Sequence, residues 1–291
     1  MSTVMRLLAR ASLPFDSLRR AGSRAPGKDR TGLLEHADEV SVTSHGPLFW
    51  AGYDSIAHAL WRSQEVTLLR PIVKALPRPI ADFGCGDGSF ARLLDTPHID
   101  LGIDIDPDAV AAATASGMYS RVVLTDGAII PLPDQSCASI LSNSVLEHCP
   151  DIDATLAEIA RILRPGGRFV ATMPSPAFTA HLRWWFGRKA ADAVNSESVH
   201  INLHDQSSWQ GMLARHGLAV RRVVAHQHPG FTWAYRMSRL LGRRALGRFP
   251  LVHQGALRLL SKRYRTLLAR SLVRCPPRQA ANLLIIAERL R

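Results

Sequence analysis

Long apolar runs and paired cysteines are both missing from this 291-residue sequence. No stretch approaches the roughly 18 consecutive apolar residues of a membrane-spanning helix. The four cysteines form no Cys-x-x-Cys pair and have no histidine at zinc-ligand spacing, which argues against a disulfide framework and a structural zinc site. We therefore expect a cytoplasmic protein without metal ligands, and a position at the periphery of a membrane stays open.

Acidic residues are scarce at both ends of the chain. Residues 1–30 hold seven Lys and Arg against two Asp, and residues 231–291 hold 14 against one Glu, which leaves 15 basic and 21 acidic residues in 31–230. The net charge of +12 therefore belongs to the ends, and an anionic partner is expected there and not in the middle. Residues 1–46 are expected to form a basic arm or, being rich in Arg and poor in acid, a cleaved targeting peptide.

A helical spacing of apolar residues follows the arm. These residues recur near one stripe between positions 48 and 76, and Pro77 and Pro79 end the pattern. The spacing predicts a helical lead-in to the domain behind it. The stripe consists of Ile56, Leu60, Val66, Leu69 and Val73.

Strand and helix patterns alternate from residue 79 onward, which is typical of a parallel sheet covered by helices. We predict an α/β fold with a seven-stranded, mostly parallel sheet and helices on both faces. Strands are expected in 79–84, 99–106, 120–127, 137–145, 168–174, 218–226 and 281–290, and helices in 89–96, 107–117, 151–163 and 207–217.

A long basic segment, residues 231–278, separates the last two expected strands. Its second half places Leu257, Leu260, Tyr264 and Leu267 on one helical stripe, which predicts a basic amphipathic insertion, the second half of a helical hairpin. Such an element suits either an anionic membrane surface or a lid over the site. The expected limits are 1–46 for the arm, 47–230 for the core, 231–278 for the insertion and 279–291 for the final strand of the core.

The segment DFGCGDGSF, residues 82–90, joins the first expected strand to its helix and contains three glycines. Such a turn lets the backbone approach a ligand and points free N–H groups at it. A dinucleotide fingerprint would place its third glycine at position 89, which is Ser, whereas this turn has Gly88. The carboxylate of Asp82 would repel a pyrophosphate and attract a cation. The turn therefore favours a positively charged cofactor without phosphate.

Four motifs in order resemble those of class I S-adenosylmethionine-dependent methyltransferases that act on small molecules, lipids and quinones. They are DFGCGDG, GIDIDPDAV, LTDGAIIPLPDQSCASILSNSVLEH and RILRPGGRFVATMP, within about 78–175. Cys137 and Ala138 stand where the family usually has Phe-Asp, which we interpret as a local packing variation. The resemblance implies a Rossmann-like fold with a helical lead-in, and S-adenosylmethionine as the cofactor.

The resemblance also implies roles for single residues. Asp104 matches the residue that binds both ribose hydroxyls, which one carboxylate does by accepting two O–H bonds. Asp126 matches the residue that accepts from the adenine amino group, although Asp-Gly is also a common turn. The cofactor-binding residues implied are Asp82, Gly84, Cys85, Gly86, Gly88, Asp104, Ile105, Asp126, Gly127 and Asn143.

Residues on the acceptor side have several interpretations. His148 lies where the family's fourth strand delivers residues toward the methyl group, and it either takes a proton from an acceptor hydroxyl or shapes the site. His200, in the polar stretch 197–204, either binds substrate or belongs to a loop docked on the following helix. Trp184 and the two aromatic residues after it form an acceptor pocket, a membrane-facing lip or core packing.

The activity implied by the resemblance is methyl transfer from S-adenosylmethionine to an O, N or C nucleophile. The basic insertion makes a lipid-like or membrane-associated small molecule the leading acceptor, with an anionic membrane surface as partner. A soluble metabolite such as a sugar or polyketide stays open, as does a non-catalytic cofactor-binding role. Nucleic acid is disfavoured as a partner, because no aromatic-basic RNA-binding module is present.

Overall fold

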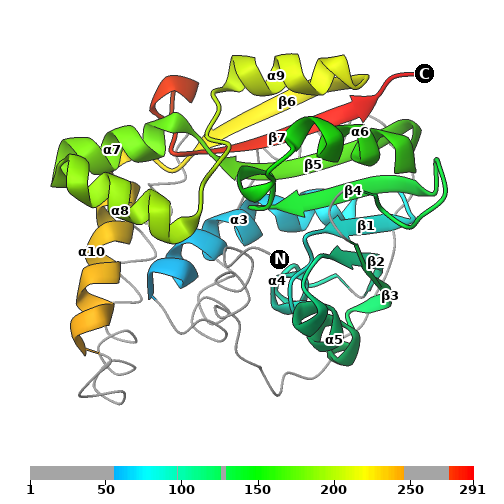
Figure 1. Cartoon of the computed structure of the whole chain (residues 1–291), viewed down its shortest axis with the longest axis horizontal. Helices are drawn as coiled ribbons and strands as arrows, with labels where there is room; N and C mark the ends of the chain where they lie inside the picture. Colours follow the sequence, from blue (N-terminus) through cyan, green and yellow to red (C-terminus); the bar gives the residue numbers. More distant parts are fainter. Residues whose placement is uncertain (1–55, 97, 126–128, 246–274) are drawn as a thin grey trace.

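The computed structural model describes residues 56–96, 98–125, 129–245 and 275–291 (Figure 1). Seven strands form one sheet in the order β3-β2-β1-β4-β5-β7-β6. The first five strands of this order pair in parallel, and β7 is antiparallel to both β5 and β6. The predicted seven-stranded, mostly parallel Rossmann-like sheet is confirmed. The strands are β1 (Ile80–Phe83), β2 (Ile99–Asp104), β3 (Tyr119–Leu124), β4 (Cys137–Asn143), β5 (Leu163–Pro174), β6 (Leu218–His226) and β7 (Asn282–Arg289).

Helices cover both faces of this sheet, as the alternating pattern predicts. One core cluster joins the sheet to α6 and α9, and another joins it to α3, α4 and α5 (Figure 1). The described helices are α3 (Ile56–Lys74), α4 (Ser89–Leu93), α5 (Pro107–Ser116), α6 (Ile152–Ile162), α7 (Pro176–Phe186), α8 (Arg188–Ser198), α9 (Gln206–Arg215) and α10 (Pro229–Ala245), with 3-10 turns η3 (Leu146–His148) and η4 (Pro277–Gln279).

Capping residues explain where the helices of the core begin. The side chain of Asp106 accepts from the backbone N–H of Asp108 and Ala109, Pro107 occupies the first turn, and Gly117 (φ 66°) ends α5 in the left-handed region. Asp151 caps α6 in the same manner by accepting from Ala154 N. These local signals place the helix starts near the carboxyl ends of the parallel strands.

The lead-in helix α3 carries the predicted apolar stripe into the core. Val66, Leu69 and Val73 are at most 5% exposed. The side chains of Ile56 and Leu60, and the arm 1–46, lie outside the described residues. Because α3 belongs to the core cluster that also contains α4 and α5, it is an integral part of the domain.

Two helices that the sequence pattern did not indicate, α7 and α8, follow β5. Together with α10 they pack on the start of α3 through a third cluster that contains Trp61, Phe178 and Phe231. The strand β5 begins at Leu163 and not at Arg168, because Leu163 already pairs with Cys137 across a bulge. Thus the arginine-proline-glycine turn belongs to the strand.

The basic insertion is described only in its first part. α10 begins at Pro229, two residues before the expected boundary, and buries Phe231 and Tyr235 against α3 and α7. The expected second helix of the hairpin, with Leu257 through Leu267, lies outside the described residues. None of the described helices combines the length and the apolar character needed to cross a membrane.

Candidate functional site

The glycine turn after β1 is tight on one side. Gly84, Gly86 and Gly88 have φ values of 77°, 55° and 80°, which side-chain-bearing residues rarely adopt. A Cβ atom on Gly84 would lie 2.3 Å from Cγ2 of Val145, at the start of η3, and one on Gly88 would lie 2.8 Å from the hydroxyl of Ser116. A side chain at either of these two positions would be strained, because φ is positive and a neighbouring side chain lies within 3 Å of the Cβ position.

The middle glycine faces open space. Among the residues that the structure describes, a Cβ atom on Gly86 would meet no atom within 4 Å. Its backbone N–H donates to Oδ2 of Asp104 at 2.8 Å. The turn is therefore packed against protein at both ends and open in its middle, which is the shape of a cradle for a ligand.

Asp104 ends β2, the strand next to β1, and lies beside this opening. Its Oδ1 accepts from the backbone N–H of Ile105 (2.8 Å) and of Asp106 (3.1 Å). Burial raises the pKa of Asp104, while these backbone hydrogen bonds act in the opposite direction. The carboxylate and the half-buried Ile105 thus lie where the sequence predicted them, at the carboxyl edge of the sheet.

Asp82 and Cys85 lie inside the fold. The carboxylate of Asp82 is 3% exposed and accepts a hydrogen bond from the hydroxyl of Tyr119 at 2.8 Å. Burial raises the pKa of Asp82 to about 7. The Cys85 side chain is buried against Gly102. Both side chains support the turn from within. The structure therefore does not present the carboxylate of Asp82 to a cation.

The remaining expected cofactor residues divide into two groups. Asp126 and Gly127 lie outside the described residues. Asn143 is 8% exposed, accepts from the hydroxyl of Thr172 at 2.6 Å and donates to Oε2 of Glu65 at 3.2 Å. Its side chain is therefore engaged in a buried network.

Glu65 on α3 is the centre of that network. Its side chain is fully buried, and burial alone would raise its pKa, but the neighbouring Arg62 guanidinium and the Ser144 hydroxyl hold the pKa of Glu65 below its ordinary value. The donors come from α3, from the end of β4 and the residue after it, and from the start of β7. Five side chains donate to it at 2.8–3.3 Å: Trp61, Arg62, Asn143, Ser144 and Asn282. The Thr172 hydroxyl, which donates to Asn143, lies 3.4 Å from Oε1 of Glu65.

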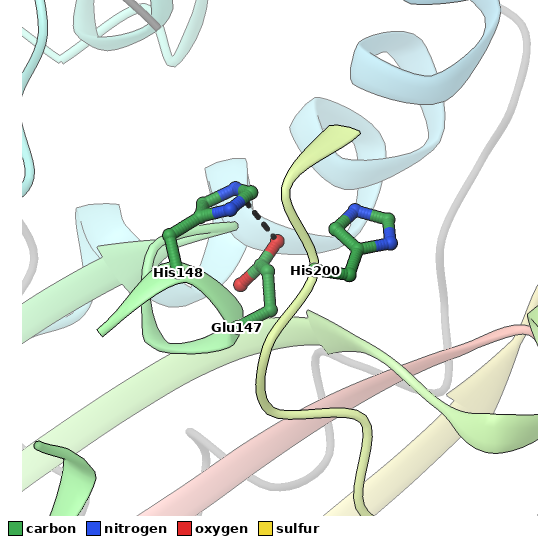
Figure 2. A group of neighbouring side chains, drawn as sticks. All are labelled: Glu147, His148 and His200. Atoms are coloured by element: carbon green, nitrogen blue, oxygen red, sulfur yellow. Dashed lines mark ion pairs between the residues drawn. The ribbon is translucent and has the colours of Figure 1, made fainter. Parts of the chain in front are cut away.

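A second polar group, Glu147, His148 and His200, lies at η3 (Figure 2). Nδ1 of His148 lies 3.0 Å from the carbonyl oxygen of Val199, and Nε2 lies 3.8 Å from Oε1 of Glu147. The rings of His148 and His200 are 5.6 Å apart. Burial raises the pKa of Glu147 to about 8 and lowers the pKa of His148 and, to about 3, that of His200. The structure thus brings the two predicted histidines together with a carboxylate.

Comparison with known proteins agrees with this geometry. Residues 81–171 match a family described as a methyltransferase domain. The chain contains a class I S-adenosylmethionine-dependent methyltransferase domain. The match includes the glycine turn, Asp104 and η3. Because S-adenosylmethionine is the cofactor of this family, the open side of the turn is its expected place.

Relatives of this methyltransferase domain are similar over part of their length. A probable S-adenosylmethionine-dependent methyltransferase of Mycolicibacterium smegmatis is 35% identical over 40% of this chain and 45% of its own length. A malonyl-[acyl-carrier protein] O-methyltransferase of Methylococcus capsulatus is 32% identical over 55% of this chain and 61% of its own. A solved structure of a putative sarcosine dimethylglycine methyltransferase from Galdieria sulphuraria shares the fold, with 16% identity, a TM-score of 0.53, and coverage of 89% of this chain and 97% of that one. The chain thus spans about half the length of the first two relatives.

The fold does not bring Trp184 into its core. Trp184 is 73% exposed, and its ring lies 4.3 Å from that of Trp185, which is 42% exposed. The prediction of core packing is therefore wrong for these two residues. Phe186, in contrast, packs against the cluster formed by α3, α7, α8 and α10. Asn202, from the predicted polar stretch, is buried and structural.

Two buried carboxylates, Glu65 and Glu147, were not found by the sequence analysis. Glu65 lies four residues before Leu69, on the apolar stripe of the predicted helix, so a charged residue on that stripe was an available signal. Glu147 gave no signal beyond its place beside His148. Their burial arises from tertiary contacts between segments far apart in the sequence.

Proposed function

We propose that this protein transfers a methyl group from S-adenosylmethionine to an oxygen of a small, lipid-like acceptor. The observation that carries the transfer is the pairing of an open glycine turn with a carboxylate: Gly86 faces free space and its N–H is bonded to Asp104. The oxygen acceptor is supported by the similarity to O-methyltransferases, which covers part of this chain.

The residues around the turn fit the cofactor. The Asp104 carboxylate has the chemistry to accept from two ribose hydroxyls, with Ile105 beside it, and the backbone of Cys85 and Gly86 forms the floor of the cradle. When bound, S-adenosylmethionine supplies an electrophilic methyl group on a sulfonium. The protein then contributes alignment of the acceptor and exclusion of water.

The acceptor side is formed by η3 and the loop after α8. Val145 contacts the glycine turn directly, which places Glu147 and His148 within a few residues of the cofactor cradle. His200 joins them from the loop. We propose that this polar group contacts the acceptor.

Two features support a lipid-like acceptor presented at an anionic surface. Residues 231–278 contain twelve Lys and Arg and no acidic residue. Large aromatic side chains are exposed on the neighbouring α7 and α10, namely Trp184, Trp185 and Trp233 at 73%, 42% and 44%. Aromatic residues beside basic ones suit the interface of a membrane.

Mass spectrometry of products tests this function. Lipid and metabolite extracts are incubated with the protein and methyl-labelled S-adenosylmethionine, and label is expected in the lipid fraction. Asp104→Asn is expected to weaken cofactor binding at least about tenfold, since the loss of a hydrogen bond to a charged group costs about 1.5–3 kcal/mol. Asp108→Asn, an exposed neighbour at the start of α5, is the matched control. Label in water-soluble products would instead identify a metabolite acceptor, and calorimetry without cofactor binding would remove the proposal.

A further inference from the structure

Two segments distant in sequence are joined beside the glycine turn. The backbone N–H groups of Ile201 and Asn202 both donate to the carbonyl oxygen of Glu147, at 2.8 and 3.0 Å. The side-chain amide of Asn202 donates to the carbonyls of Leu146 (3.0 Å) and Cys149 (2.6 Å). Four hydrogen bonds therefore fix the loop after α8 against η3, and none of them involves the side chains of Glu147, His148 or His200.

This junction gathers three side chains with metal-ligating atoms. One ligand atom from each of Glu147, His148 and His200 lies within 4.8 Å of the other two (Figure 2). Among the residues that the structure describes, Oε2 of Glu147 and Nδ1 of His200 are buried without a hydrogen-bond partner. Glu147 is only 2% exposed, so its unbonded oxygen lies away from bulk water. Buried polar atoms of this kind need a partner.

His148 is already oriented as a metal ligand is. A carbonyl oxygen only accepts, so Nδ1 of His148 donates to Val199 and Nε2 keeps its lone pair on the side of Glu147. Metal-ligating histidines commonly donate their other ring N–H to a carbonyl in this way. Val199 itself is a β-branched residue at φ 53°, a conformation that costs free energy and turns its carbonyl toward His148.

We propose that Glu147, His148 and His200 bind one divalent transition-metal ion of the zinc class. Two imidazoles and one carboxylate are a common donor set for Zn²⁺, and three protein ligands leave a coordination position open. Donors bonded to zinc at about 2.0–2.2 Å lie roughly 3.4 Å apart, so a pair at the 4.8 Å limit has to approach by about 1.4 Å.

The open position suits an acceptor oxygen. Val145 connects η3 to the glycine turn, so the ion would lie on the acceptor side of the cofactor cradle. This role, unlike ion binding itself, rests on the proposed methyl transfer. The positive groups that face the site, Arg62 and Arg239, are paired with Glu65 and Glu197.

Metal binding by protein free of any histidine tag tests the site. After removal of metal with a chelator, ZnCl₂ is titrated against a chromophoric competitor, and CoCl₂ is used to record the visible spectrum of the bound ion. We expect one ion per chain and a tetrahedral cobalt spectrum. Glu147→Gln and His200→Ala are each expected to weaken zinc binding at least about tenfold and to abolish that spectrum.

His204→Gln is the matched control, because His204 lies in the same loop and contacts Trp209 rather than η3. It is expected to bind zinc as the wild type does. The site would be overturned if the wild-type protein shows no saturable zinc binding. It would also be overturned if Glu147→Gln and His200→Ala bind zinc as tightly as the wild type does. Calorimetry of cofactor binding on the same samples separates the two proposals: cofactor without zinc removes only the metal site, and zinc without cofactor removes only the methyl transfer.

Discussion

The hydroxyl of Tyr119 on β3 donates a hydrogen bond to the buried carboxylate of Asp82 on β1, at 2.8 Å. β2 lies between the two strands in the sheet, and the ring of Tyr119 crosses it over Gly102, where a Cβ atom would lie 3.3 Å from the ring. It compensates only in part for burial, because the pKa of Asp82 is still raised to about 7. Asp82 therefore makes the stability of the domain depend on pH near neutrality.

The first prediction concerns this dependence. An acid whose pKa is higher in the folded than in the unfolded protein stabilises the fold fully below the unfolded value, and this contribution is lost as pH rises through the folded value. For Asp82 the window runs from about 4 to about 7. Asp82→Asn is expected to become more stable relative to wild type by up to roughly 4 kcal/mol across it, since each pKa unit corresponds to about 1.36 kcal/mol. Urea unfolding at several pH values measures the difference, and parallel curves would contradict it.

The second prediction separates the two sides of the glycine turn. Gly84→Ala is expected to destabilise the domain by about 2–4 kcal/mol, because its Cβ overlaps Val145 and its φ is 77°. Gly86→Ala is expected to cost only about 1 kcal/mol of backbone strain, since no atom of the described part of the chain lies within 4 Å of its Cβ position. Its effect should appear in calorimetry as cofactor binding weakened about tenfold or more. Equal cofactor binding by Gly86→Ala and wild type would show that the open side is not the cofactor cradle.

The third prediction concerns Glu65. Its replacement by Ala leaves buried donors from α3, β4 and β7 without an acceptor, so we expect a loss of about 2–4 kcal/mol in the free energy of unfolding. Glu65→Gln, which keeps the shape and one acceptor, is expected to lose less. Lys74 lies on the same helix as Glu65 and forms an exposed ion pair with Asp95, which follows α4. Lys74→Ala should change stability by at most about 1 kcal/mol. Similar losses in the Glu65 and Lys74 variants would contradict a central role for Glu65.

The fourth prediction concerns the exposed tryptophans of α7. Full-length protein is expected to sediment with anionic vesicles at low salt and to be released by high salt, with a blue shift of tryptophan fluorescence on binding. Trp184→Ala should reduce binding while leaving stability within about 0.5 kcal/mol, because the side chain is 73% exposed. Protein that stays in the supernatant with anionic vesicles would remove the membrane surface as a partner.

The sequence predicts the sheet better than it predicts the site. Strands such as β7, with six consecutive buried residues, and helices with local caps such as Asp106 carry their own signals. The helix α8 has no comparable signal, because seven of its eleven residues are polar and its two buried residues, Ala191 and Val194, are small. The helix α7 does carry one, the Ser175 cap followed by Pro176, which the sequence analysis missed. The glycine turn and Asp104 stood out because their residue types are required locally.

The rest of the site depends on long-range contacts. Glu147 and His200 become neighbours only because the loop after α8 bonds to the backbone of η3, and no spacing in the sequence encodes that. The family resemblance implied that Asn143 binds the cofactor, and in the structure its amide donates to Glu65, 78 residues earlier. Asp82 illustrates the same limit, since burial and Tyr119 decide how its carboxylate behaves.

The position of β7 in the sheet has a consequence for the order of synthesis. β6 pairs with β7, and β7 alone joins it to β5, so residues 218–226 have no place in the sheet until residues 282–289 have left the ribosome. Asn282, the first residue of β7, also completes the set of donors to Glu65. A nascent chain halted before β7 would therefore expose the edge of β5 and the whole of β6, which makes this interval the time at which a chaperone is most needed.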